Sequence, residues 1–325
     1  MQSLRGRLAY EFLRLAGSPF DRSTPLEDQR AYLERQGRRV PVSREVKVQS
    51  TSIGPTHAEW LRPREARRDA ALLYLHGGGY TMGSCNTHRA LVARIAAAAG
   101  VSALLIDYRL APEHPFPAAL TDAKNAYGWL VHRGLEAGRI AVIGDSAGGG
   151  LTAALAVGLR DQGQPLPGAL VCMSPWLDLT MSGETMKTCA RADPLITWET
   201  SVLNARRYVG DHHPKEPLIS PLFANPAGLP DMYIQVGQHE VLRSDSERFA
   251  TSARQAGVNV RFEVWPGMWH VWHAWAPWVP EAGRAIRLIG DFVQKELANL
   301  DGLRDSETFV CLHIGKGRFT GITSI

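Results

Sequence analysis

The sequence has little lysine and no long uninterrupted apolar run. Only six of its 36 basic residues are lysines, and with 32 acidic residues the formal net charge is +4. The basic residues are spread along the chain, apart from short runs such as "LRPREARR" at 61–68, so nothing indicates a nucleic-acid partner. The longest apolar tract, "LVARIAAAAGVSALLIDY", is interrupted by Arg94 and Gly100. The sequence therefore predicts no membrane-spanning segment.

Cysteine is also scarce, and its spacing excludes several classes of protein. The four cysteines show no CxxC spacing; they are Cys85, Cys172, Cys189 and Cys311. This pattern predicts free thiols in a reducing compartment. The first 17 residues carry charges throughout, unlike a signal peptide, and no HExxH pattern or Cys/His cluster suggests a metal. We expect a cytoplasmic protein with no membrane or nucleic-acid partner, no metal and no other cofactor; whether it forms a homodimer is left open.

Short apolar runs that alternate with helical patterns occupy most of the chain. Six runs predict strands: 71–75, 102–106, 139–143, 169–173, 232–236 and 259–264. Helical patterns lie between them, near 87–99, 118–133, 147–161 and 244–256. Two alternating segments before them, 44–50 and 56–62, predict an antiparallel pair. This rhythm is typical of a mostly parallel sheet covered on both faces, with functional residues just past the carboxyl ends of the strands.

The remaining segments suggest how the chain is divided. Residues 1–40 predict two amphipathic helices, and 41–300 predict one large α/β domain. Residues of about 180–220 separate two strands by more than one crossover helix needs, so we expect an insertion over the sheet edge. A long connection of this kind is usually functional. Residues 301–325 follow a terminal helix and are interpreted as a tail.

The stretch "RIAVIGDSAGGG" carries the strongest indication of chemistry. An apolar strand runs into Gly144, Asp145, Ser146, Ala147 and Gly148, and a helix of small residues follows, which is the G-x-S-x-G nucleophile elbow. So tight a turn strains the backbone of Ser146, and a side chain at 144 or 148 would collide with neighbouring backbone. A phosphate-binding turn is the alternative, but the spacing fits neither GxGxxG nor GxxxxGK[ST]. We therefore predict that Ser146 is a nucleophile.

The stretch "LLYLHGGGYTMGS" precedes the elbow by about seventy residues. By itself it could be a flexible loop or a phosphate cradle, but before an elbow it predicts an oxyanion loop. The backbone N–H groups of Gly78, Gly79 and Ala147 are the expected oxyanion donors. Gly77 completes the glycine run, and we expect His76 to hold the loop in shape and not to act as a base.

Four stretches in this order, "HGGGY", "DYRLAPEHPFPAALTDA", "GDSAGG" and "WPGMWH", resemble the bacterial hormone-sensitive-lipase-like (family IV) esterases of the α/β-hydrolase superfamily. They span roughly residues 70–275. The resemblance implies an α/β-hydrolase fold with an eight-stranded, mostly parallel sheet. It also implies a helical cap made of residues 1–40 and the 180–220 insertion, and hydrolysis of small-molecule carboxylic esters without a cofactor. The block at 108–119 has no chemistry that we can derive from its residues and serves as a family marker.

The catalytic base is expected downstream of the serine, where "EVWPGMWHVWHAW" offers two histidines. His270 lies in a loop after a predicted strand, whereas His273 lies where a helix can already have begun. The family pattern also places the base at His270. Members of the family typically have a small residue or proline before this position and Gly-Phe after it, but here Trp269 and Val271 flank it, which changes the pocket wall. We interpret His273 as a packing residue or a pocket contact.

The stretch "GQHEVLRSDSE" contains three carboxylates, of which one is expected to orient the base. Ser244 and Glu247 match the S-x-x-E capping box, so Asp245 and Glu247 are interpreted as charges in the first turn of a helix. Glu240 has no such local role and lies thirty residues before His270. Many relatives carry Asp in a "DPL" sequence where this chain reads "EVL", but Glu can fill the role. We predict Glu240 as the acid, with Asp245 as the alternative.

These residues together predict a serine carboxylesterase that acts through an acyl-enzyme. A second "DPL", at 193–195, precedes the wrong strand for the acid and is interpreted as a cap or pocket feature. Tryptophans crowd the insertion and the histidine loop, and any that face the cleft would favour short acyl chains; they are Trp176, Trp198, Trp269, Trp272, Trp275 and Trp278. The alternatives are an amidase or peptidase with the same triad, and a non-catalytic ligand receptor, which the presence of His270 disfavours.

Overall fold

An eight-stranded sheet forms the centre of the computed structural model, which describes residues 2–314, with side chains up to residue 298. Its strands are β1 (Val46–Ile53), β2 (Thr56–Pro63), β3 (Arg67–Leu75), β4 (Val101–Ile106), β5 (Ile140–Asp145), β6 (Ala169–Met173), β7 (Met232–Gly237) and β8 (Val260–Trp265). Their order in the sheet is β1-β2-β4-β3-β5-β6-β7-β8. β2 pairs antiparallel with β1 and with β4, and all other pairs are parallel. The predicted mostly parallel sheet of eight strands is confirmed.

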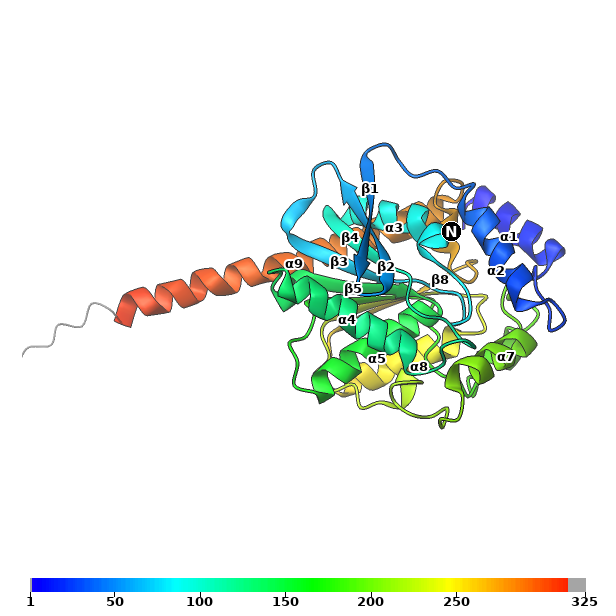
Figure 1. The fold of residues 1–325 in the computed structure, drawn as a ribbon. Coiled ribbons are helices and arrows are strands. Elements are labelled where there is room, and N and C mark those ends of the chain that lie inside the picture. The colour runs from blue at the N-terminus through cyan, green and yellow to red at the C-terminus, as the bar shows by residue number, and fades with distance from the viewer. Residues whose placement is uncertain (1, 315–325) are drawn as a thin grey trace, which may run out of the picture.

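Helices cover both faces of the sheet (Figure 1). The helices are α1 (Leu4–Ala16), α2 (Leu26–Gly37), α3 (Cys85–Ala99), α4 (Ala118–His132), α5 (Ala147–Asp161), α6 (Thr185–Thr188), α7 (Trp198–Val209), α8 (Arg243–Gln255) and α9 (Pro280–Ile314), with 3-10 turns η1 (Ala137–Arg139), η2 (Pro221–Phe223) and η3 (Trp272–Trp275). Successive residues of β3 point to opposite faces. Leu73 and Leu75 join one core with α4, α5 and α8, and Leu72 and Tyr74 join the other with α3 and α9. Burial on both faces explains why the strands are continuous apolar runs.

Helices α1, α2 and α7 lie at one end of the sheet (Figure 1). The N-terminal helices are tied to the body by side-chain hydrogen bonds: Tyr10 Oη donates to the carbonyl of Ala192 (3.0 Å), and Arg30 Nε donates to the carbonyl of Thr81 (2.8 Å). Thr81 Oγ1 in turn donates to Asn204 Oδ1 of α7 (3.1 Å). The division into a cap and a catalytic domain stays a prediction.

The last helix, α9, continues through the first part of the predicted tail. It spans Pro280–Ile314, and its C-terminal part projects from the body (Figure 1). Residues 315–325, the rest of that tail, lie outside the described residues. None of the described helices is both long enough and apolar enough to cross a bilayer.

Candidate active site

Four neighbouring strands each place one polar side chain just past their carboxyl ends. Ser146 follows β5, Ser174 follows β6, Glu240 lies three residues after β7, and His270 lies five residues after β8. Because these parallel strands are adjacent in the order β5-β6-β7-β8, the four side chains meet at one edge of the sheet. Three of them were predicted as site residues; Ser174 was not.

The backbone of Ser146 is held in a strained conformation between β5 and α5. Its φ of 54° and ψ of −122° lie where side chains are rarely tolerated. A Cβ at Gly144 would collide with the carbonyl of Gly148, and a Cβ at Gly148 would collide with the carbonyl of Leu75. These are the collisions predicted from the sequence. The glycines therefore allow the turn to present Ser146 at the amino end of α5.

Ser146, His270 and Glu240 form a continuous hydrogen-bonded chain. His270 Nε2 is 2.9 Å from Ser146 Oγ, and His270 Nδ1 is 2.8 Å from Glu240 Oε2. The His270 side chain is 7% exposed and that of Glu240 is fully buried. Burial opposes protonation of His270, but the hydrogen bond and charge of Glu240 outweigh it, so the pKa of His270 is raised above its usual value. The imidazole is thus oriented on one side and made more basic.

Ser174 contacts both Glu240 and the loop that carries His270. Its hydroxyl donates to Glu240 Oε1 (2.7 Å), and its oxygen accepts the N–H of Val271, next to His270 (3.1 Å). The N–H of Gly237 also donates to Glu240 Oε1. Ser174 is buried and has a φ of 49°. Its place in "SPW" directly after a strand is the one sequence feature that could have suggested this role.

The glycine loop after β3 lies against the elbow, where the N–H of Gly77 donates to Asp145. Gly78 and Gly79 have φ values of 119° and 61°, and a Cβ at Gly78 would collide with the carbonyl of Met82. Within residues 2–314, the N–H groups of Gly78, Gly79 and Ala147 donate to no protein acceptor. Unpaired N–H groups in this setting can bind an oxyanion.

Asp145 and His76 both bond to Gly77 and hold this loop in place. Asp145 Oδ1 accepts the N–H of Gly77 (3.1 Å), and the ring of His76 donates from Nδ1 to the carbonyl of Gly77 (2.8 Å). Burial lowers the pKa of His76 to about 4. Burial alone would raise the pKa of Asp145, but nearby His88 and the hydroxyl of Tyr74 outweigh it and lower the pKa to about 2. A neutral histidine and a charged aspartate therefore hold the loop through Gly77.

The block at 108–119 also supports the glycine loop, a role that its sequence did not reveal. Tyr108 Oη donates to the carbonyl of His76 (2.7 Å) and stacks on its ring, with centroids 4.1 Å apart. The N–H of Ala111 donates to the carbonyl of Tyr80, next to the glycines (2.9 Å). The block thus supports the backbone of the glycine loop.

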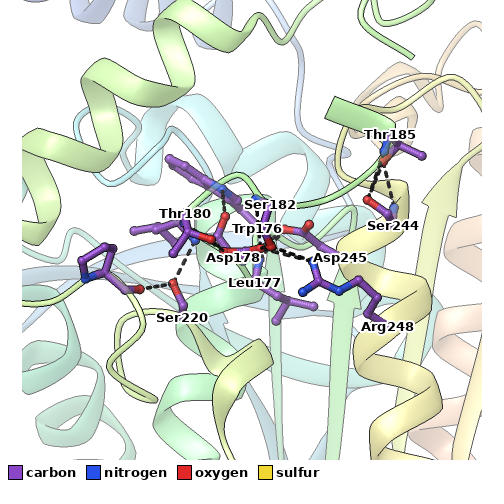
Figure 2. A network of polar contacts seen from close by, with 12 residues as sticks. Trp176, Leu177, Asp178, Thr180, Ser182, Thr185, Ser220, Ser244, Asp245 and Arg248 are labelled. Carbon is purple, nitrogen blue, oxygen red and sulfur yellow. Dashed lines mark hydrogen bonds and ion pairs between the residues drawn. The ribbon is translucent and has the colours of Figure 1, made fainter. Parts of the chain in front are cut away.

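The predicted capping box at the start of α8 is wrong. The helix begins at Arg243, with Leu242 in the N-cap position and no side-chain cap. Ser244 instead bonds to Thr185 of the insertion, with 2.8 Å between the two hydroxyl oxygens (Figure 2). Glu247 pairs with Arg243 at 3.3 Å on the helix surface. The hydroxyl of Ser244 thus bonds to Thr185 and does not cap the helix as the local pattern had predicted.

Asp245 lies in the first turn of α8, but it is not a solvated helix charge. It is fully buried, and its Oδ2 accepts the N–H groups of Leu177 (3.3 Å) and Asp178 (3.1 Å). Figure 2 shows it beside Asp178, which also pairs with Arg248. Burial, with the adjacent charge of Asp178, raises the pKa of Asp245 well above its usual value. The residue anchors the segment after Ser174, whereas the carboxylate in contact with His270 is that of Glu240.

The second "DPL" aspartate, Asp193, ties the insertion to the loop that carries Glu240. Its Oδ2 accepts the N–H of Val241 (3.0 Å), and its Oδ1 accepts that of Ile196 (3.0 Å). Burial raises its pKa. The sequence predicted a cap or pocket feature here and did not predict the direct contact with the loop that carries Glu240.

The second histidine and two tryptophans of the same loop are packed in the interior. His273 is fully buried with Nε2 2.8 Å from Gln235 Oε1, and burial lowers its pKa to about 3. Trp269 and Trp272 are also fully buried and belong to a core cluster that includes Tyr10. These tryptophans are packing residues, so they give no direct measure of the cleft.

One group of side chains has the composition of a metal site. The ligand atoms of His57, Cys85 and Asp107 lie within 4.8 Å of one another at the carboxyl end of β4. His57 Nδ1 is 2.7 Å from Asp107 Oδ2, and burial raises the pKa of the Cys85 thiol far above its usual range. A hydrogen bond between His57 and Asp107 and a protonated thiol account for the grouping. The expectation that the protein needs no metal stays a prediction.

Comparison with known proteins gives concordant results. A family model described as "alpha/beta hydrolase fold" matches residues 72–274. An acetyl-hydrolase of Streptomyces hygroscopicus is 45% identical over 244 residues, which cover 75% of this chain and 81% of the relative. The structure of an esterase from the bacterial hormone-sensitive lipase family superposes with a TM-score of 0.87 at 42% identity, covering 91% of this chain and 99% of that one. The structure of EstE5 soaked with p-nitrophenyl butyrate gives 0.87 at 40% identity with the same coverage.

Proposed function

The chain belongs to the bacterial hormone-sensitive-lipase branch of the α/β-hydrolases and is a carboxylic ester hydrolase, and we propose that it works through an acyl-enzyme on Ser146. The observation that carries the proposal is the chain of contacts from Ser146 Oγ through His270 to Glu240, at 2.9 and 2.8 Å. Both distances lie within the range required for proton transfer between a nucleophile and its base.

In the first half of the reaction, Ser146 Oγ attacks the ester carbonyl carbon as its proton passes to His270 Nε2. The carbonyl oxygen becomes an oxyanion, which accepts hydrogen bonds from the N–H groups of Gly78, Gly79 and Ala147. When the tetrahedral intermediate collapses, the C–O bond of the ester breaks and the leaving alcohol takes the proton from His270. Ser146 is then acylated.

In the second half, a water molecule gives its proton to His270 Nε2 and attacks the acyl carbon. The acid product leaves and Ser146 recovers its proton. Glu240 keeps the Nδ1 proton of His270 in place and stabilises the imidazolium that forms in each half. The raised pKa of His270 fits this demand, because the ring must gain a proton beside a buried carboxylate.

We also propose that the acyl pocket accepts short chains. Tyr80, next to Gly79, stacks on Tyr208 of α7 with ring centroids 3.7 Å apart, and Trp176 lies 6.2 Å from the Tyr80 ring. All three are at most 4% exposed. This aromatic group packs beside Gly79, and we infer that it limits the space for a long acyl chain. The acetyl-hydrolase name of one relative and the butyrate ester soaked into another point to the same class of substrate.

A fluorophosphonate probe tests the nucleophile. The parent enzyme should be labelled at one serine and lose its activity on p-nitrophenyl butyrate, and Ser146→Ala should abolish both. Ser52→Ala, at an exposed serine of β1, is the matched control and should behave as the parent. Equal labelling of Ser146→Ala would refute the assignment, and a folded parent that is never labelled would favour a ligand receptor.

The substrate class is tested with matched esters and amides and with a chain-length series. We expect cleavage of p-nitrophenyl acetate and butyrate, little cleavage of the palmitate ester, and slow cleavage of the corresponding anilides. Tyr208→Ala should extend activity to longer chains by removing part of the aromatic group. Comparable turnover of butyrate and palmitate esters by the parent would contradict the short-chain proposal, and faster cleavage of anilides would make it an amidase.

A further inference from the structure

The N-terminal helix α1 carries an apolar stripe on its outer face. Leu4, Leu8, Phe12 and Leu15 are 70%, 61%, 65% and 82% exposed. Their spacing of four, four and three residues places them on one side of the helix. Among the described residues eight large apolar side chains are exposed, and half of these belong to this stripe. Large apolar side chains gathered in this way mark an interaction surface.

The opposite face of α1 is fixed to the enzyme over the histidine loop. Gly6, Tyr10 and Leu13 are its buried residues, and Tyr10 and Leu13 share a core cluster with Trp269, the neighbour of His270. The ring of Tyr10 stacks on His239 with centroids 4.3 Å apart. Because the inner face is packed against the enzyme, the orientation of the apolar outer face is fixed in the folded protein.

The charges on α1 decide which partner the stripe suits. Arg5 lies on one flank of the stripe and Arg7 and Arg14 on the other, and all three are exposed. Glu11, the one acidic residue of the helix, pairs with Arg14 at 3.0 Å, so the net charge of three minus one, or +2, is carried by Arg5 and Arg7. Two copies that packed stripe against stripe would bring like charges together, whereas an anionic surface would pair with the arginine flanks.

No part of α9 covers the stripe, and two exposed tryptophans add to the apolar surface of the described chain. The C-terminal part of α9 projects from the side of the molecule opposite α1, so it does not cover the stripe (Figure 1). Trp198 and Trp278 are 46% and 54% exposed. Trp198 lies three residues after Leu195, and Trp278 lies three residues after Trp275. Leu195 and Trp275 pack against the same cluster as the inner face of α1. Exposed tryptophans are typical of proteins that bind at a bilayer interface.

We propose that α1 docks the enzyme on the surface of an anionic phospholipid layer, with the stripe in the acyl boundary and the arginine flanks among the headgroups. This is adsorption to a surface, without a spanning segment, and it departs from the expectation of no membrane partner drawn from the sequence. It would hold the catalytic edge of the sheet close to esters that partition into the layer. The inference goes beyond the proposed function, because it concerns where the enzyme acts and not how it cleaves the ester.

Sedimentation with vesicles tests the docking in a Ser146→Ala background, where no catalysis alters the lipid. The full chain should partition onto phosphatidylglycerol–phosphatidylcholine vesicles and much less onto pure phosphatidylcholine. The pair Leu8→Ser and Phe12→Ser should lower the partition coefficient about tenfold or more, because two large apolar groups stay in water. Val48→Ser with Val264→Ser, at exposed apolar residues outside α1, is the matched control and should leave it unchanged. Equal binding by the two pairs would overturn the proposal.

A charge variant and a mass measurement separate the lipid surface from a second copy of the chain. Arg5→Gln with Arg7→Gln should weaken binding to anionic vesicles, and added salt should have the same effect. Sedimentation velocity should show that the Leu8/Phe12 pair does not change the oligomeric state. A dimer that this pair dissolves, with no vesicle binding by the parent, would make the stripe a self-association surface and refute the proposal. In the Ser146-intact enzyme, the pair should cleave soluble p-nitrophenyl acetate like the parent, so docking and catalysis can fail separately.

Discussion

Replacing Glu240 by glutamine tests the whole chain of contacts, because the surroundings dictate how the new amide must lie. Glu240 Oε1 accepts two donors, the hydroxyl of Ser174 and the N–H of Gly237. In Glu240→Gln the amide oxygen should take this position, since an NH₂ group there would face two donors. The NH₂ then faces His270 Nδ1 and donates to it. The ring must carry its proton on Nε2, where it cannot accept the proton of Ser146.

The size of the effect follows from the cost of the alternative arrangement. Turning the amide round would leave two buried donors without an acceptor, at about 1–3 kcal/mol each. The productive tautomer is then reduced by about 30-fold to 10⁴-fold. Loss of the negative charge that stabilises the imidazolium adds to this. We expect kcat/KM at neutral pH to fall by about 10³- to 10⁴-fold, with the fold retained.

Steady-state kinetics on p-nitrophenyl butyrate from pH 5 to 9 checks this result. Activity of the parent should rise with pH as His270 loses its proton, because the free imidazole is the base. Glu240 raises the pKa of His270 against the effect of burial, so the residual activity of the variant should rise at lower pH. Asp245→Asn is the matched control and should keep activity within about tenfold. If Glu240→Gln kept most of its activity while Asp245→Asn lost it, the assignment of the acid would be reversed.

Three further outcomes are expected. Gly78→Ala should lower kcat about 100- to 1000-fold, because its Cβ would displace an oxyanion donor. Circular dichroism checks that the variant folds, and an unchanged kcat would contradict the role of the donor. Ser174→Ala should lower kcat about tenfold or more and leave KM nearly unchanged, since it removes support from Glu240 and Val271; a change in KM alone would indicate a binding role. In thermal melts, Asp245→Asn should gain stability relative to the parent from pH 5 to 8. The raised pKa of Asp245 means that the folded parent binds a proton the unfolded chain has lost above about pH 4, so its stability falls as pH rises; parallel curves would refute this.

The polar network around α8 shows why local patterns misled the interpretation of one carboxylate. S-x-x-E is a pattern of the isolated helix end, and it takes no account of what packs against that end. In the folded chain, Thr185 approaches Ser244, and the N–H groups of Leu177 and Asp178 approach Asp245 (Figure 2). Thr185 belongs to the insertion, and Leu177 and Asp178 lie just before it, 59 to 68 residues away from their partners in sequence. Their position depends on how the insertion folds back over the sheet.

Motifs whose requirements are met within a few residues could be predicted from the sequence alone. The steric demands at Gly144 and Gly148, and the alternation of apolar strands with helices, specify the elbow and the two-sided sheet because they act over short separations. From these and the resemblance, the contact between Ser146, His270 and Glu240 could be expected before the structure was known.

Only the tertiary structure decided how distant segments complete these local features. Ser174 became visible as a support because β6 lies between β5 and β7, an order that no single stretch encodes. The apolar residues of α1 show the same limit. Helical periodicity reveals that the helix has two apolar faces, but which face is covered depends on where the rest of the chain packs. In the folded chain, Tyr10 and Leu13 are buried against the enzyme, whereas Leu8 and Phe12 are exposed.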